Sequence, residues 1–214
     1  MHRHTLRQTL FLPLLLSMAS AGATGIAVQV QDAAGKVLPD TIIYVESESG
    51  PATGRAAPTA EIEQKGLKFV PLVSVVQTGA KVFFPNNDKV RHHIYSFSPA
   101  HKFDQKLYSG QSAAPQVFDK AGTVVLGCNI HDKMVAYVKV VDTPYFAKTD
   151  GAGAARIELP AGGKYVVKAW HYNTVGGATP EQVLTVKAGD ALATAVFKLP
   201  MKPPAADDAA SSTL

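Results

Sequence analysis

Hydrophobic and polar positions alternate along most of the chain, over short stretches of residues. Examples are "IAVQVQ" at 26–31 and "MVAYVKVV" at 134–141, and a period of two predicts β-strands. Turn-forming segments such as "DAAGK" at 32–36 and "TDGAG" at 149–153 separate these stretches. No long window after the first residues has helical spacing. The pattern therefore predicts an all-β protein built as a Greek-key sandwich or a pair of sandwiches.

The beginning of the chain differs from the rest. A basic start, "MHRHTLR", leads into the apolar run "TLFLPLLLSMA" and the small residues "AGA", which is typical of a signal peptide over residues 1–23. We expect export to the periplasm, a mature start near Thr24 and no membrane span after cleavage. Loss of Arg3 and Arg7 lowers the formal net charge from +4 to +2. This near-neutral balance, without a basic run, gives no case for nucleic acid as a partner.

The single cysteine of the chain lies in "CNIHDKM", between the strand-like stretch "GTVVLGC" and the next strand. A strand, a tight loop and a strand allow the side chains of Cys128, His131 and Met134 to converge. Thiolate, imidazole and thioether donors suit copper, and the weak thioether argues against zinc. The alternative for a lone cysteine is a buried, inert side chain that acts as a small hydrophobe.

A second imidazole comes from "VFFPNNDKVRHHIYSFS", where a strand leads through a polar turn to two histidines. Together the two segments resemble the cupredoxins, the blue-copper fold of plastocyanin and amicyanin. Asn86 and His92 reproduce the interval of that family, and Cys128, His131 and Met134 match its Cys-x-x-His-x-x-Met pattern. The resemblance implies one mononuclear type 1 copper, with His92, His131 and Cys128 as equatorial ligands and Met134 as a weak axial ligand.

The doublet leaves a choice between two histidines. Neighbouring residues of a strand point to opposite faces, so His92 and His93 are not expected to bind the same metal. The six-residue interval favours His92, with His93 as the alternative. His93 also occupies the position at which plastocyanins usually carry an asparagine that links the two ligand loops.

The resemblance extends over most of the chain. Residues 65 to 175 resemble bacterial proteins labelled methylamine utilization protein or plastocyanin-like protein. The segments 25–47 and 143–199 resemble the carboxypeptidase regulatory-like domain, a small transthyretin-like sandwich. We therefore expect these two segments to form one sandwich, with the cupredoxin inserted between them. The alternative is an N-terminal strand pair that packs on the copper domain.

These observations predict five segments. They are a signal peptide at 1–23, an N-terminal hairpin at 24–64 that joins the C-terminal sandwich, a cupredoxin domain at 65–142, a carboxypeptidase regulatory-like sandwich at 143–200 and a disordered tail at 201–214.

The resemblance implies a monomeric periplasmic carrier of single electrons, with a cytochrome or a quinoprotein dehydrogenase as its redox partner. Two alternatives stay open, a copper carrier or buffer without redox cycling and a cell-envelope binding module. An enzyme is not expected. The sequence has no "GxSxG" nucleophile motif, its acids are scattered over turns, and its glycines lie in β-turns rather than in phosphate-binding loops.

Overall fold

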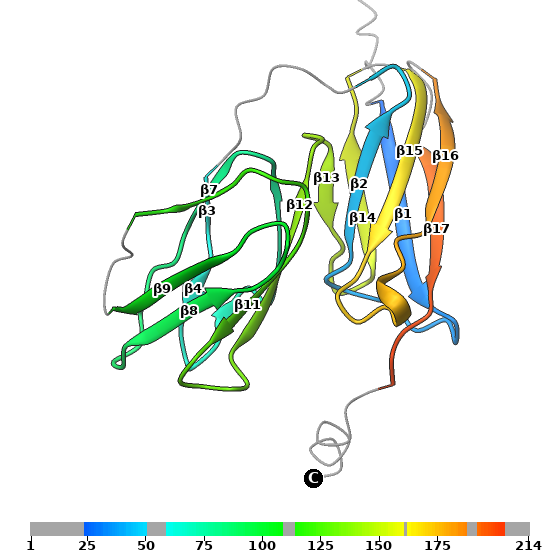
Figure 1. The fold of residues 1–214 in the computed structure, drawn as a ribbon. Coiled ribbons are helices and arrows are strands. Elements are labelled where there is room, and N and C mark those ends of the chain that lie inside the picture. The colour runs from blue at the N-terminus through cyan, green and yellow to red at the C-terminus, as the bar shows by residue number, and fades with distance from the viewer. Residues whose placement is uncertain (1–23, 51–58, 109–113, 161, 188–191, 204–214) are drawn as a thin grey trace, which may run out of the picture.

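The computed structural model describes residues 24–50, 59–108, 114–160, 162–187 and 192–203. Nearly all of its regular structure is β-strand, and the described residues contain one short 3-10 turn, η1 (Val175–Gly177). The all-β class predicted from the alternating pattern is confirmed. The strands form two sandwiches that lie side by side (Figure 1).

The first body, called here the flanking sandwich, is built from both ends of the chain. Its strands are β1 (Gly25–Asp32), β2 (Ile42–Ser47), β13 (Phe146–Lys148), β14 (Ala154–Glu158), β15 (Gly163–Trp170), β16 (Glu181–Val186) and β17 (Ala193–Leu199). They form two sheets, β14-β1-β17 and β13-β2-β15-β16. Alternate residues of β1, including Ile26 and Val30, are fully buried between the sheets, as a period of two requires.

The second body, called here the inserted sandwich, uses the middle of the chain. Its strands are β3 (Ala60–Glu61), β4 (Glu63–Gln64), β5 (Phe69–Val70), β6 (Val73–Gln77), β7 (Ala80–Phe83), β8 (His92–Ser96), β9 (Phe103–Tyr108), β10 (Gln116–Phe118), β11 (Gly122–Cys128) and β12 (Val135–Val141). A five-stranded sheet, β6-β12-β11-β8-β9, faces the sheet β10-β7-β3, and β4 pairs with β5. Phe84, Phe118 and Leu126 are fully buried in its core.

The path of the chain joins the two bodies twice. β1 pairs antiparallel with β14 and parallel with β17, and β2 pairs with β13 and β15. The inserted sandwich thus lies between β2 and β13 in sequence. Residues 60–64 belong to it, because β3 pairs with β7 and β4 pairs with β5. The structure places this short segment in the second body rather than in the N-terminal hairpin.

An apolar interface holds the two sandwiches together. Five residues are buried in one cluster that spans both bodies: Ile42, Tyr44, Val73, Val141 and Trp170. Beside it, the Tyr137 ring of β12 stacks on Tyr172 with a centroid separation of 4.6 Å. The ammonium of Lys139 lies 5.5 Å from the ring centroids of both Tyr44 and Trp170. Burial, together with the charge of Lys168, lowers the pKa of Lys139.

Two expected segments lie wholly or largely outside the described residues. The signal peptide at 1–23 lies outside them, as does the tail from residue 204. The first tail residues are ordered, because Met201 forms a β-bridge with Thr174 and Lys202 N donates to the Asn173 carbonyl at 2.9 Å. Across the described residues, the structure has no helix long and apolar enough to span a membrane.

Candidate metal centre

Three side chains with metal-binding atoms meet at one end of the inserted sandwich. His92 begins β8, Cys128 ends β11 and His131 lies in the loop between β11 and β12. Cys128 Sγ lies 3.7 Å from His92 Nδ1 and 3.9 Å from His131 Nδ1, and the donor atoms of all three lie within 4.8 Å of one another. Donors bound to one ion at about 2.0 to 2.3 Å are roughly 3.5 to 4 Å apart, so the spacing fits a shared metal ion.

Strand pairing brings His92 and Cys128 together across the sheet. β8 and β11 run antiparallel, with Cys128 opposite Ile94 and Gly127 opposite Tyr95. His92 is two residues before Ile94, so the His92 side chain lies on the same face of the sheet as those of Ile94 and Cys128, which points into the core. His92 is fully buried and Cys128 is 3% exposed. The thiol and the imidazole therefore face each other away from water.

The loop after Cys128 is closed by backbone hydrogen bonds. Asn129 N donates to the His93 carbonyl at 3.1 Å and extends the pairing of β11 with β8. Met134 N donates to the His131 carbonyl at 2.9 Å and forms a tight turn. The turn leaves His131 partly exposed. Met134 is 1% exposed and packs in the same apolar cluster as Cys128.

The two histidines of the doublet have different surroundings. His93 points away from the Cys128 cluster, and its Nε2 pairs with the Asp104 carboxylate of β9 on the outer face. An irregularity in the β8–β9 register lies between His92 and Ile94, where the pairing shifts from Tyr108 to Gln105. The structure thus brings His92, and not His93, to Cys128 and His131.

Asp88 holds the far side of the His92 ring. Its Oδ2 lies 2.9 Å from His92 Nε2, while Gly66 N and Leu67 N donate to the same carboxylate at 2.7 and 3.0 Å. Burial of Asp88 favours its neutral form, but the hydrogen bonds from Leu67, His92 and Gly66 outweigh this effect and lower its pKa. An ionised Asp88 accepts a hydrogen bond from the Nε2–H group of His92. Nδ1 is then unprotonated, and its lone pair is directed at the cluster.

Asn86 fixes the loop that carries Asp88. Its buried side-chain amide donates to the carbonyls of Val90 and Tyr108 at 2.9 and 3.0 Å, and its Oδ1 accepts the Asp88 N–H at 3.0 Å. Sequence reasoning used Asn86 only to count the interval to His92 and missed Asp88. The signal for Asp88 was available, since an acid four residues before a candidate ligand in a polar turn can reach its ring.

The donor set decides which ion fits. A thiolate and two imidazoles, with a thioether in the same cluster, form a soft to borderline set that suits copper. The apolar surroundings of Cys128 and Met134 keep water away from this site. The residues present therefore fit a copper ion.

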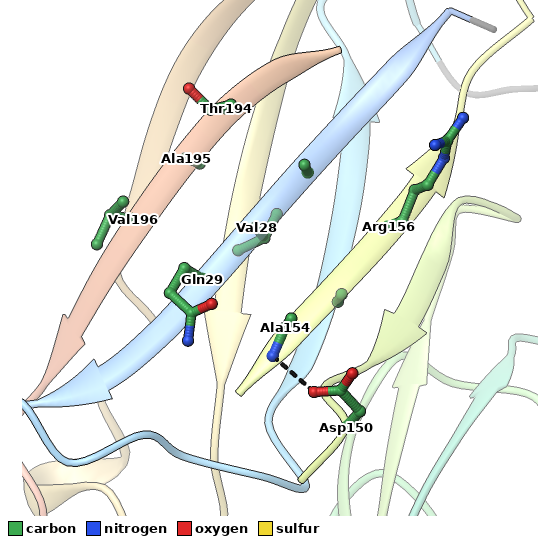
Figure 2. A pocket seen from close by; sticks show the side chains of 10 residues that line it. Val28, Gln29, Asp150, Ala154, Arg156, Thr194, Ala195 and Val196 are labelled. Atoms are coloured by element: carbon green, nitrogen blue, oxygen red, sulfur yellow. Dashed lines mark hydrogen bonds between the residues drawn. The ribbon is translucent and has the colours of Figure 1, made fainter. Parts of the chain in front are cut away.

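A hollow of about 510 Å³ on the flanking sandwich offers no comparable chemistry. Figure 2 shows small side chains such as Ala154 and Ala195 on its floor, across the sheet β14-β1-β17. The Asp150 carboxylate at its border accepts the N–H groups of Ala152 and Ala154, so it is engaged in its own turn. The lining contains neither histidine nor cysteine.

Comparisons with known proteins give structural likeness alone. No family model matches the chain, and no curated protein matches it. Solved structures that resemble it include a purple cupredoxin from Nitrosopumilus maritimus, with 23% identity over 38% of this chain and 99% of that one and a TM-score of 0.34. Amicyanin from Paracoccus versutus has 17% identity over 39% and 81% of the two chains, with a TM-score of 0.35.

A copper-containing nitrite reductase from Thermus scotoductus is also similar. The two chains share 22% identity over 44% of this chain and 25% of the reductase, with a TM-score of 0.37. Likeness at this level identifies neither a function nor a partner. The case for a copper site therefore rests on the side chains of this protein.

Proposed function

We propose that this chain binds one copper ion and carries single electrons. Cys128 Sγ, His92 Nδ1 and His131 Nδ1 would be the equatorial ligands and Met134 a weak axial ligand. The convergence of the three donor atoms within 4.8 Å, beside a cluster of buried apolar side chains, is the observation that supports this most directly. A bound copper would supply the Cu(I)/Cu(II) couple.

The residues around the cluster suit electron transfer because they resist rearrangement. The His92 ring is held by Asp88, Cys128 by the β8–β11 ladder, and His131 by the turn that Met134 N closes. Cu(I) and Cu(II) prefer different coordination geometries. Ligands that are held in place by the fold cannot move toward either geometry, so the change in coordination between the two oxidation states stays small. A small rearrangement makes electron exchange fast.

Burial argues against substrate turnover at this site. His92, Cys128 and Met134 are at most 3% exposed, so only the side of His131 meets the surface. A catalytic metal site keeps a position open for substrate or water, whereas an electron needs only close approach. We therefore propose a carrier rather than an enzyme, with His131 as the route for the electron.

The biological setting is part of the proposal. The leader-like start supports export to the periplasm, where a cytochrome or a quinoprotein dehydrogenase would meet the monomer through a small, transient interface. The flanking sandwich would be the carboxypeptidase regulatory-like domain that segments 25–47 and 143–199 resemble. It supports the copper domain through the apolar interface at Tyr44 and Trp170.

Voltammetry of the copper-loaded protein tests this function. We expect a reversible one-electron wave with the metal retained in both oxidation states, and no such wave for Cys128→Ser. Loss of copper on reduction or oxidation would contradict the electron-carrier function and favour a copper carrier. Transfer of Cu(I) to a chelator that is complete within the mixing time would do the same.

A further inference from the structure

Three loops surround the metal cluster and form one face of the inserted sandwich, called here the metal-end face. They are residues 65–68, 86–91 and 129–134. Asp88 joins the first loop to the second through Gly66 and Leu67, and its bond to His92 joins both to the cluster that holds the third. In Figure 1 these loops lie at the lower end of the body that contains β8 and β11.

Each loop of the metal-end face exposes one large apolar side chain. Leu67 is 47% exposed, Val90 is 46% exposed and Ile130 is 50% exposed. Ile130 is adjacent to His131, the one proposed ligand that meets the surface. Apolar side chains spread singly over a surface need no explanation, but here each of the three loops around the cluster carries one, and the three are called here the apolar patch.

Leu67 is exposed at a conformational cost. Its φ is +60°, next to Gly66 at +64°, and this consecutive left-handed pair directs both N–H groups at the Asp88 carboxylate. A leucine is strained in this region of the backbone, by about 1 kcal/mol relative to glycine. The backbone bonds to Asp88 account for the conformation, yet a glycine would adopt it without strain. The apolar side chain at this position is thus unexplained by the fold.

The same loops carry an excess of positive charge. Their cations are Lys65, Lys68, Lys89, Arg91 and Lys133, all exposed, and their acids are Asp88 and Asp132. Five cations against two carboxylates leave three net positive charges within the loops, compared with +2 for the chain from residue 24, and one of the cations, Lys65, is paired with Glu63 at 3.9 Å. Asp88 is bound to His92 and to two backbone N–H groups, so its charge is largely compensated.

We propose that the metal-end face docks a redox protein whose electron-exchanging edge is apolar and surrounded by carboxylates. This rests on the proposed electron-carrier function and names the chemistry of its partner. The apolar patch would seat the partner beside His131, and the cations would steer and orient it. Two copies of this chain would repel each other at this face, which disfavours self-association through it.

Small oxidants of opposite charge test the field at this face. Hexacyanoferrate(III) is an anion and tris(phenanthroline)cobalt(III) a cation, and each takes one electron from reduced copper, so that Cu(I) becomes Cu(II) while Fe(III) becomes Fe(II) or Co(III) becomes Co(II). No proton or bond is exchanged. We expect the rate with the anion to fall as ionic strength rises and the rate with the cation to rise or stay flat, measured by stopped flow.

Charge reversal locates the effect on the metal-end face. Lys89→Glu with Lys133→Glu should slow the reaction with hexacyanoferrate(III) on the order of tenfold at low salt, with convergence near 1 M salt. The matched control, Lys164→Glu with Lys187→Glu, changes the net charge equally but lies on exposed positions of the flanking sandwich. Its rate should stay within about twofold of the wild type. An unchanged visible spectrum would show that each variant keeps its copper site.

The apolar patch is tested with protein acceptors. Leu67→Gly with Ile130→Ser should leave the rate with hexacyanoferrate(III) unchanged but slow the reaction with a negatively charged cytochrome. A positively charged cytochrome should react slowly with the wild type and with this variant alike. Equal slowing by both charge-reversal pairs, or a faster reaction with the cationic oxidant and cytochrome, would overturn the proposal. Absence of electron exchange with every oxidant would instead refute the carrier function itself.

Discussion

The Nε2 atom of His92 lies 2.9 Å from Asp88 Oδ2, on the opposite side of the ring from the Cys128 sulfur. This relationship fixes both the orientation and the tautomer of His92, because the ionised carboxylate takes the only ring proton. It also ties the metal cluster to the loop that carries Gly66 and Leu67. Asp88 therefore positions a proposed ligand without binding the metal.

Replacement of Asp88 should weaken copper binding. Asp88→Ala removes the acceptor for His92 Nε2 and releases the N–H groups of Gly66 and Leu67, so we expect a loss of about 10- to 100-fold in copper affinity. Competition with a copper chelator measures this. Asp104→Asn is the control, because Asp104 pairs with His93 on the outer face. Equal affinities for Asp88→Ala and wild type would refute the positioning role.

The choice between the two histidines has a direct test. His92→Ala should abolish the thiolate-to-copper absorption, because it removes one of the three converging donors. His93→Ala should keep the absorption, since its ring faces Asp104. Optical spectra of both variants with one equivalent of Cu(II) measure this. The reverse result would assign the ligand to His93.

The sequence indicated much of this fold because its strands follow a clear period of two. The convergence of Cys128 and His131 also follows from local spacing, since a tight loop joins two strands. The six-residue interval from Asn86 favoured His92 over His93, and β8 places His92 on the same face as Ile94, which pairs with Cys128. Asp88 lies only four residues before His92, so its contact with the ring was within reach of sequence reasoning, whereas its bonds to Gly66 and Leu67 join loops that are distant in sequence.

The expected segment 24–64 ends in short strands, at residues 60–64, that pair within the inserted sandwich. Two-residue strands carry too little pattern to show their partners, and β3 finds β7 only after the sandwich closes. The partners of longer strands are easier to predict from sequence. β1 repeats apolar residues over its whole length, and its family resemblance indicated pairing with the C-terminal strands, where the structure has it.

Acid should destabilise the flanking sandwich through His171. The ring is 6% exposed, its Nδ1 accepts the Asn173 N–H at 3.0 Å, and the ring also hydrogen-bonds to the Pro39 backbone. Burial lowers the pKa of His171, and the opposing effects of Asp40 and Pro39 are smaller. The unfolded chain therefore takes up a proton first as pH falls. Stability is full above about pH 6.5 and declines below it, until the pH passes the folded-state pKa.

Thermal unfolding of the metal-free protein between pH 8 and pH 5 measures this effect. The wild type should lose stability below about pH 6.5, by at most roughly 1.4 kcal/mol per pH unit from this one group. His171→Gln should be less stable at pH 8 and show a shallower decline. Parallel pH profiles for the two proteins would contradict the assignment.

The Tyr95 ring leaves no room for a side chain at Gly127. A Cβ added at Gly127 would lie 2.7 Å from Tyr95 Cζ and 2.8 Å from its hydroxyl, because this ring covers the strand directly before Cys128. We expect Gly127→Ala to lower the free energy of unfolding by about 1 to 3 kcal/mol, measured with denaturant. Gly151→Ala is the control, since an added Cβ there meets nothing within 4 Å.

A double variant separates crowding from other effects at this position. In Gly127→Ala combined with Tyr95→Ala, the added methyl group no longer meets the ring. The cost of Gly127→Ala in this background should therefore be smaller than in the wild type. An equal cost in both backgrounds would show that Tyr95 is not the cause.

The central claim is that Cys128, His92 and His131 hold one copper ion. Its most direct test is a Cu(II) titration of the protein from residue 24 onward, followed by visible absorption and electron paramagnetic resonance, beside Cys128→Ser. The account predicts an intense thiolate-to-copper absorption that saturates at one equivalent and is lost in Cys128→Ser. A protein that stays colourless with Cu(II), or an absorption that persists without the thiol, would contradict it.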